Sequence, residues 1–200
     1  MKNSSREKII EAAVELFDRY GYEKTTLEDI VGRTGKTKTS VYYYFDGKPA
    51  ILREVLSREF SSVQSKLIEI WSKSPEKEPY RFKEYLKNRM TLIIGMRVYP
   101  QFTVNQYSDC VNSFSDIVLK VRDIFDSWEK DYFLKVCVKG KELGALKEGV
   151  NPKAFAEMLL SLLKAIEIQY FVAKDKTAVL STYSEIIDYL INDSCEKCDV

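Results

Sequence analysis

Residues 25–48 read TTLEDIVGRTGKTKTSVYYYFDGK, and this stretch decides the interpretation of the whole chain. Thr26 is followed three residues later by Asp29, a spacing that resembles a capping box and predicts the start of a short helix. Gly35 is placed to end that helix, because glycine readily adopts the left-handed conformation found after a helix C-terminus. Thr37 is placed to cap a second helix. Two short helices joined by a tight turn predict a helix-turn-helix.

The second of these helices carries the residues expected to read DNA. In a helix-turn-helix the second helix enters the major groove, and the residues at its N-terminus meet the edges of the bases. Those residues here have short or flexible hydrogen-bonding side chains: Thr37, Lys38, Thr39 and Ser40. Lysine donates to guanine O6 and N7, and hydroxyl groups bond to bases or to phosphates.

Three successive tyrosines follow: Tyr42, Tyr43 and Tyr44. Successive helical residues lie ~100° apart, so the three rings cannot all face inward. An outward hydroxyl beside a DNA groove suits phosphate oxygens. We expect Tyr42 to be exposed toward DNA, and the pattern leaves open whether the other two rings are partly packed.

The basic charge of the chain is concentrated in the same region. The chain has 31 basic and 30 acidic residues, so its net charge of +1 gives no support for nucleic-acid binding. Between Arg33 and Arg53, however, five basic residues stand against one acidic residue, a local charge of +4. A local basic segment is what attraction to DNA phosphates requires.

The segment from Phe17 to Leu52 resembles the signature of the TetR (tetracycline-repressor) family of DNA-binding regulators. The residues that carry the resemblance are Phe17, Gly21, Thr25, Thr26, Ile30, Gly35, Thr37, Lys38, Ser40, Val41, Tyr42, Phe45, Lys48 and Leu52. They span a little under a fifth of the chain. The remaining segments match the family only in the number and arrangement of their helices.

The resemblance implies roles for individual residues. Thr26 would cap the first helix of the motif and touch a phosphate, and Lys48, at the start of a fourth helix, would bind a phosphate together with helix N–H groups. The full set of DNA contacts implied is Thr26, Lys36, Thr37, Lys38, Thr39, Ser40, Tyr42, Tyr43, Tyr44 and Lys48. The chain departs from the family pattern at Val31, Gly32, Thr34, Lys36 and Thr39. Lys36 replaces a usually apolar residue, so its charge is available for DNA.

The rest of the chain is expected to be helical. Apolar residues recur with a helical period, and no alternating run indicates a strand. Breaks are expected at residues 73–79, near Pro100 and over residues 103–109. Three glycines are interpreted as helix ends and a turn: Gly140, Gly144 and Gly149. We therefore predict an all-α protein of about nine helices.

Two domains are predicted. Residues 1–47 would form a three-helix DNA-binding domain with the helix-turn-helix, and residues 48–200 a helical ligand-binding and dimerisation domain. The helix that begins at Lys48 and runs to about Trp71 would connect them. A tilt of this helix in one domain would move residues in the other domain.

Composition argues against several function classes. The chain has no His, which removes the commonest general base and metal ligand, so we do not expect an enzyme, a metal site or a cofactor. No apolar run approaches the ~20 residues that cross a membrane. The N-terminus lacks the apolar segment of a signal peptide, so a cytoplasmic protein is expected.

The four cysteines are interpreted as free thiols rather than as a disulfide framework: Cys110, Cys137, Cys195 and Cys198. In a long chain, cysteines within apolar helical patterns indicate buried thiols of a reducing compartment. The pair Cys195 and Cys198 also resembles half of a zinc site, but a second pair is missing. Two thiols in the C-terminal tail are the favoured interpretation.

The second domain is predicted to hold a small apolar or aromatic effector. The large side chains predicted to line the pocket are those of Trp71, Tyr85, Met90, Met96, Phe102, Tyr107, Phe114, Phe125 and Trp128. The resemblance further implies that the last two helices of each subunit form a four-helix homodimer interface. Their apolar stripes are Phe155, Leu159, Leu162, Ile166, Tyr170, Val179, Tyr183, Ile186, Ile187 and Leu190. The alternative is that each stripe packs only on its own domain.

The predicted function is sequence-specific regulation of transcription, in which a repressor leaves its double-stranded DNA operator when the effector binds. One alternative is an activator or a regulator that senses no ligand. Another is a helical small-molecule-binding protein that keeps the N-terminal domain without binding DNA.

Overall fold

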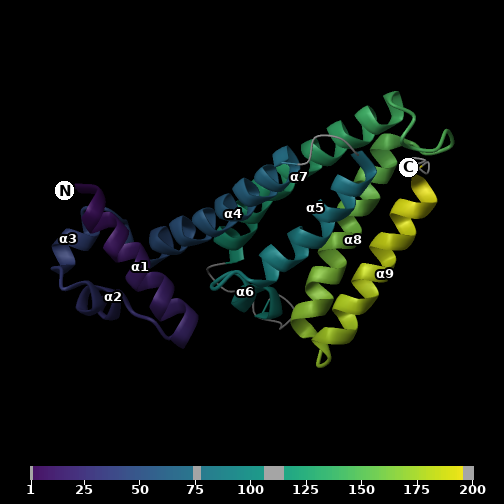
Figure 1. Cartoon of the computed structure of the whole chain (residues 1–200). Helices are drawn as coiled ribbons and strands as arrows, with labels where there is room; N and C mark the ends of the chain where they lie inside the picture. Colours follow the sequence, from purple (N-terminus) through teal and green to yellow (C-terminus); the bar gives the residue numbers. More distant parts are fainter. Residues whose placement is uncertain (1, 74–77, 106–114, 196–200) are drawn as a thin grey trace. The chain divides into compact units, whose positions relative to one another are not determined.

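The computed structural model describes residues 2–73, 78–105 and 115–195, and these residues form nine helices and no strand. The helices are α1 (Lys2–Tyr20), α2 (Leu27–Thr34), α3 (Lys38–Tyr42), α4 (Gly47–Lys73), α5 (Glu78–Ile94), α6 (Pro100–Asn105), α7 (Ser115–Glu142), α8 (Pro152–Val172) and α9 (Lys176–Ser194) (Figure 1). An isolated bridge joins Leu146 to Cys195. The prediction of an all-α fold is confirmed.

The chain divides into two compact units. The head unit comprises Met1–Ser61 and Met96–Asp123, and the body unit comprises Ser62–Gly95 and Ile124–Val200. Helices α4 and α7 therefore each contribute residues to both units. The functional division at residues 47 and 48 stays a prediction, since the first half of α4 groups with the head unit by its contacts.

The helix-turn-helix of the head unit is built by local capping. The Thr26 hydroxyl accepts the Asp29 backbone N–H at 3.1 Å, and the Asp29 carboxylate accepts the Thr26 backbone N–H at 2.8 Å. This reciprocal capping box starts α2, as predicted. Gly35 ends α2 with φ 62°, a conformation that costs glycine little because it has no Cβ. The Thr37 side chain then caps α3 by accepting the Ser40 N–H at 3.2 Å.

Apolar side chains from the first three helices and the following turn meet in the core of the head unit. Phe17 of α1, Ile30 of α2 and Val41 of α3 are fully buried, and Phe45 is buried after α3. These residues recur at helical spacing on one face of each helix, so their burial follows from the pattern. The opposite faces of α2 and α3 remain open to solvent.

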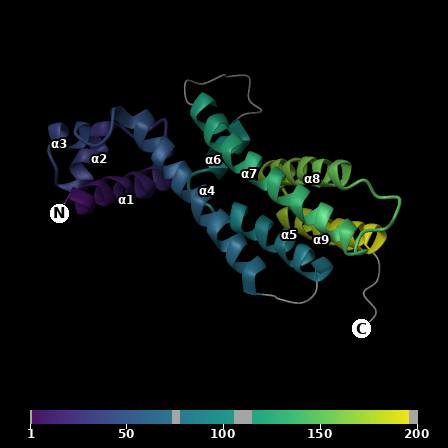
Figure 2. The same ribbon diagram turned by 90° about the horizontal axis from the view of Figure 1, so that it is seen from above.

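The body unit is a bundle in which α8 and α9 pack on each other and both contact α5. Figure 2 shows these three helices lying alongside one another. Asn151 caps α8 by accepting the Lys153 and Ala154 N–H groups, and Pro152 occupies the first turn, where its missing N–H costs nothing. Fully buried side chains of this core include Leu67, Tyr85, Leu86, Phe133, Leu159 and Ile187.

Two predicted breaks differ from the structure. The stretch after Pro100 is helical up to Asn105, because proline is tolerated in a first helical turn. Gly140 does not end a helix but lies within α7. A Cβ on Gly140 would lie 3.5 Å from Leu146 Cγ, an ordinary van der Waals contact, so the packing there does not require glycine. Gly144, with φ 70°, forms that turn as expected.

None of the described helices combines the length and the apolar character that a membrane span requires.

Candidate nucleic-acid interface

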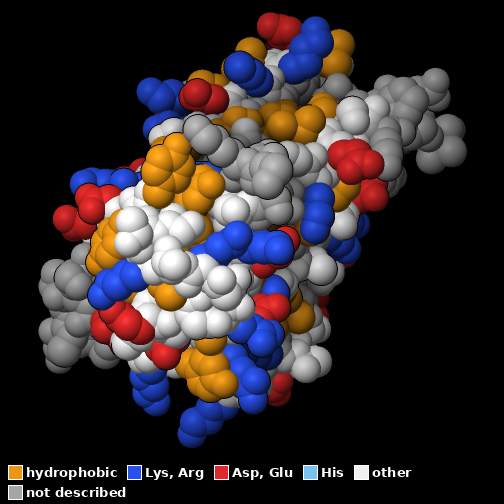
Figure 3. Space-filling view, turned by 90° about the vertical axis from the view of Figure 1, so that its left-hand side faces the viewer, with side chains coloured by type: hydrophobic (Ala, Val, Ile, Leu, Met, Phe, Trp, Pro, Cys, Tyr) orange, Lys and Arg blue, Asp and Glu red, His pale blue; other side chains and the backbone are white. Residues whose placement is uncertain are grey.

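The residues predicted to contact DNA lie together in the head unit. Thr26 and Thr37 are the exposed N-caps of α2 and α3, and Lys38 and Thr39 are exposed in the first turn of α3. Ser40 and Lys36 are half-buried. In the view of Figure 3, Lys and Arg side chains, interspersed with Asp and Glu side chains, lie around a patch of uncharged surface.

The three tyrosines divide between surface and interior. Tyr42 is 51% exposed and Tyr43 67% exposed, whereas Tyr44 is half-buried. The rings of Tyr43 and Tyr44 meet edge to face, with centroids 4.9 Å apart. Because Val41 and Phe45 supply the inward face, the rings of Tyr42 and Tyr43 are left on the surface.

Lys48 holds the turn between α1 and α2. Its ammonium donates to the backbone oxygens of Tyr22 at 2.9 Å and Thr25 at 2.8 Å. It also lies 4.2 Å from the centroid of the Tyr22 ring, a cation–π distance. Burial lowers the pKa of Lys48. Two of its three N–H donors therefore serve the protein itself, a role that the sequence interpretation missed.

Glu28 also lies on this surface, although it was not among the predicted DNA contacts. Its carboxylate Oε1 lies 2.5 Å from the Lys38 ammonium, and both side chains are more than half exposed. The hydrogen bond from Lys38 lowers the pKa of Glu28, and the same bond raises the pKa of Lys38. The two positions are ten apart in the chain. No helical period connects them, and Glu28 lies outside the basic segment Arg33–Arg53, so nothing in the sequence indicated this pair.

The segment that precedes α6 is bound to both α4 and α1 within the head unit. The Glu59 carboxylate on α4 accepts the backbone N–H groups of Arg97, Val98 and Tyr99. The Arg97 guanidinium pairs with Asp18 of α1 at 2.8 Å. Residues 97–99 thus connect the two helices that flank the helix-turn-helix.

The predicted pocket residues fall into three groups. Trp71, Tyr85, Met90, Phe125 and Trp128 belong to the body unit, whereas Met96 and Phe102 belong to the head unit. Tyr107 and Phe114 lie outside the described residues.

An aromatic cluster gathers part of the body-unit set around Tyr132. The Tyr132 ring stacks on Tyr85 at 5.1 Å and on Trp128 at 5.7 Å, and the Trp71 ring meets it edge-on at 5.5 Å. Sequence spacing did not single out Tyr132. By contrast, Phe102 contacts the ring of Tyr22 in the head unit at 6.0 Å.

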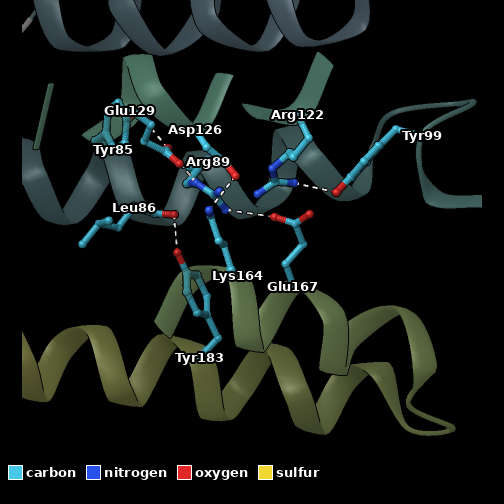
Figure 4. Close-up of polar contacts among 10 residues, drawn as sticks. All are labelled: Tyr85, Leu86, Arg89, Tyr99, Arg122, Asp126, Glu129, Lys164, Glu167 and Tyr183. Carbon is cyan, nitrogen blue, oxygen red and sulfur yellow. Dashed lines mark hydrogen bonds and ion pairs between the residues drawn. The ribbon is translucent and has the colours of Figure 1, made fainter. Parts of the chain in front are cut away.

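A buried charge cluster lies beside these rings, and the sequence analysis did not foresee it. Arg89 Nε lies 2.7 Å from Glu129 Oε1, and Arg89 Nη1 lies 3.4 Å from Glu167 Oε2. The Tyr85 hydroxyl donates to Glu129 at 3.2 Å (Figure 4). Burial raises the pKa of Tyr85 well above its usual value, which keeps the hydroxyl protonated as a donor. Charges buried this deeply are tolerated only when paired.

Two of the cysteines border a small cavity in the body unit. Cys137 and Cys195 are buried, and both line a space of about 30 Å³ with Phe82, Leu146 and Phe155. Burial raises the pKa of Cys137 to about 12. The expectation of a buried thiol is confirmed for Cys137. The expectation that Cys195 lies in a tail is wrong, because Cys195 is buried as the C-cap of α9 and bridges to Leu146. Cys110 and Cys198 lie outside the described residues.

Most residues of the predicted dimer stripes pack within their own unit. Six are buried: Phe155, Leu159, Ile166, Val179, Tyr183 and Ile187. Four are half-buried: Leu162, Tyr170, Ile186 and Leu190. The Tyr183 hydroxyl donates to the Leu86 backbone oxygen at 2.5 Å, which ties α9 to α5.

The neighbouring face of α8 and α9 is open. An open hollow of about 640 Å³ there is lined by Met158, Leu162, Glu185, Ile186, Tyr189 and Leu190. Met158 and Tyr189 are exposed and were not among the predicted interface residues.

Known proteins resemble the chain most clearly in the head. The profile of the family described as "Bacterial regulatory proteins, tetR family" matches residues 9–55. The HTH-type transcriptional repressor DhaR of Mycobacterium sp. (strain GP1) is 26% identical over 160 residues, which cover 78% of this chain and 77% of DhaR. The negative transcriptional regulator IcaR of Staphylococcus aureus (strain Newman) is 43% identical over 49 residues, which cover 24% of this chain and 26% of IcaR.

Solved structures share the fold over nearly the whole chain. A TetR-family regulator from Syntrophomonas wolfei matches with a TM-score of 0.73 and 18% identity, covering 96% of this chain and 97% of that one. A complex of SmeT with triclosan has a TM-score of 0.76 and 19% identity, with 98% and 93% covered. FadR from Bacillus subtilis with stearoyl-CoA has a TM-score of 0.69 and 17% identity, with 92% and 97% covered.

Proposed function

This chain is a transcriptional regulator of the TetR family, and we propose that it represses transcription by binding an operator through α2, α3 and the start of α4. The observation that carries the proposal is the first turn of α3, which is capped by Thr37 and presents Lys38 and Thr39 to solvent. DhaR and IcaR, which resemble the chain in this region, are named as a repressor and a negative regulator.

The DNA contacts follow from where each side chain lies. Lys38, Thr39 and Ser40 would meet base edges in the major groove. Tyr42 and Tyr43 would donate their exposed hydroxyls to phosphate oxygens, as would the Thr26 cap. For Lys48 we propose a smaller direct role than the sequence suggested, because two of its N–H donors are already engaged by backbone oxygens.

The operator would be bound by a homodimer. Two recognition helices must stand ~34–36 Å apart to enter successive turns of the major groove on one side of the duplex. The proposed interface is the open face of α8 and α9, where Met158, Ile186 and Tyr189 are available to a second copy. The six buried stripe residues would pack beneath this face, in the core of the body unit.

An effector would bind in the body unit. SmeT was solved with triclosan and FadR with stearoyl-CoA, two ligands with large apolar parts. In this chain the rings around Tyr132 would contact an apolar or aromatic body, and the Arg89 cluster would orient a polar group. Pockets of this kind combine an apolar lining with a few polar groups.

The response would pass along α4. This helix has 27 residues and is therefore ~40 Å long. Lys48 lies in its first turn and Trp71 in its last, so a tilt caused by the effector would move the turn that Lys48 holds. The effector must bind the DNA-incompetent state more tightly, with a coupling that is typically about 1–3 kcal/mol.

A binding titration tests the core of the proposal. Labelled DNA from upstream of the protein's own coding region is titrated with the wild-type chain and with Lys38→Ala, against random DNA at the same salt. Wild type should prefer the upstream DNA, and Lys38→Ala should lose about 1–3 kcal/mol of that specific binding. Equal affinity of the wild type for every DNA tested would overturn the proposal.

A further inference from the structure

The ion pair between Glu28 and Lys38 stands on the surface proposed to bind DNA. We propose that these two side chains act together as one reader of base-pair polarity, with a guanine or thymine facing Lys38 and its cytosine or adenine partner facing Glu28. The inference rests on the proposed function and adds a specificity-determining residue, Glu28, to it.

The side chains that cap α2 and α3 are engaged in their own hydrogen bonds and do not compete with the pair of Glu28 and Lys38. Asp29, the neighbouring acid, is held in the capping box with Thr26, and Thr37 is held by the Ser40 N–H. Glu28 is therefore the acid in the first turn of α2 that meets Lys38, at 2.5 Å. A carboxylate facing DNA repels every phosphate, so its presence lowers affinity unless it reads a donor or orients a neighbour.

The pair offers a donor beside an acceptor. In the major groove each base pair shows one keto oxygen and one amino group at its centre: O6 of guanine with N4 of cytosine, or O4 of thymine with N6 of adenine. The two groups are hydrogen-bonded to each other, so they lie ~2.9 Å apart. This separation is close to that of the Lys38 ammonium and the Glu28 carboxylate.

The pair of Lys38 and Glu28 distinguishes the two orientations of a base pair. The ammonium donates to a keto oxygen, and the carboxylate accepts the second N–H of the amino group. In the reversed base pair the ammonium would face an amino group and the carboxylate a keto oxygen, so both contacts would be repulsive. Guanine adds a second acceptor, N7, on the Lys38 side, whereas thymine places a methyl group there. The expected order is guanine, then thymine, then adenine and cytosine.

The test compares DNA selected from a random library by full-length wild type, Glu28→Gln and the exchanged pair Glu28→Lys with Lys38→Glu. The exchange keeps the net charge and the ion pair. Wild type should select guanine over cytosine at one position by roughly tenfold to a hundredfold. Glu28→Gln should reduce that preference, because a carboxamide both donates and accepts, while Lys38 still favours guanine. The exchanged pair should invert it, favouring cytosine or adenine.

Glu15→Gln is the matched control, since Glu15 of α1 forms another exposed ion pair with α2, to Arg33 at 2.7 Å. It removes the same charge and should leave the selected sequence unchanged. Circular dichroism melts confirm that each variant is folded. Identical profiles for wild type and Glu28→Gln, or an exchanged pair that keeps the wild-type preference, would overturn the inference. If wild type selects no sequence at all, the proposed function itself fails.

Discussion

The carboxylate of Glu59 accepts the backbone N–H of Val98 at 2.9 Å and so binds the middle of α4 to the segment that precedes α6. The same carboxylate accepts the N–H groups of Arg97 and Tyr99 at 2.8 and 3.0 Å. Gln101, in the first turn of α6, donates to the Phe17 backbone oxygen near the end of α1 at 2.7 Å. These contacts connect α1 and α4 to residues 97–101.

Replacing Glu59 by Gln should destabilise the protein. A carboxamide offers one oxygen and turns an NH₂ group toward backbone N–H donors, so at least one half-buried donor loses its partner. We expect the free energy of unfolding to fall by about 1–3 kcal/mol, measured by urea denaturation. Glu11→Gln, on the exposed face of α1, is the control. Equal midpoints for the two variants would show that the three hydrogen bonds add no net stability.

Lys48→Met should affect folding more than charge. The variant keeps the apolar stem but leaves the oxygens of Tyr22 and Thr25 without their donor. Hydrogen bonds to charged groups contribute about 1.5–3 kcal/mol, so the melting temperature should fall and operator binding should weaken. The slope of log affinity against log salt should change by less than one. If the slope of log affinity against log salt fell by a full unit while the stability stayed unchanged, Lys48 would instead be a phosphate contact alone.

Tyr43→Phe should weaken binding to all DNA sequences alike. The hydroxyl is proposed to meet a charged phosphate, and a hydrogen bond to a charged group contributes about 1.5–3 kcal/mol. Stability should be unchanged, because Tyr43 is 67% exposed. Tyr20→Phe, at the exposed end of α1, serves as the control in the same anisotropy titration. A change in sequence preference rather than in overall affinity would contradict the phosphate assignment.

Tyr189→Glu should convert a dimer into monomers. Tyr189 is 70% exposed on the face proposed to meet a second copy, and burying a carboxylate there would cost several kcal/mol. Sedimentation velocity at micromolar concentration should show a wild-type dimer and a monomeric variant. Ile124→Glu, at an equally exposed apolar position of α7, should remain dimeric. A monomeric wild type, with or without DNA, would rule out the proposed assembly.

Cys137 should be unreactive in the folded protein. Because burial raises the pKa of this thiol to about 12, the thiolate that reacts with iodoacetamide is scarce at pH 8. The raised pKa lowers the thiolate fraction by about a thousandfold relative to an unperturbed thiol, and the packing further restricts access. Peptide mass spectrometry after labelling native and urea-unfolded protein measures the ratio. Comparable labelling in both states would mean that Cys137 is accessible.

The features that could be predicted from the sequence are those made by neighbouring residues. Thr26 and Asp29 cap α2 across three positions, and Gly35 ends it through its own backbone freedom. Such interactions depend on spacing along the chain, so composition and order are enough to predict them. The burial of Phe17, Ile30 and Val41 agrees with the helical period of the apolar residues in the same way.

Tertiary structure decided what no local spacing encodes. The partners of Lys38, Lys48 and Arg89 lie 10 to 78 positions away in the chain. Which of these contacts forms depends on how the helices pack, because a charged side chain takes whichever partner the folded chain brings near. The stripes of α8 and α9 illustrate the same limit. Their period predicted two amphipathic helices, but only the packing against α5 determined which apolar residues are buried and which remain open to a second copy.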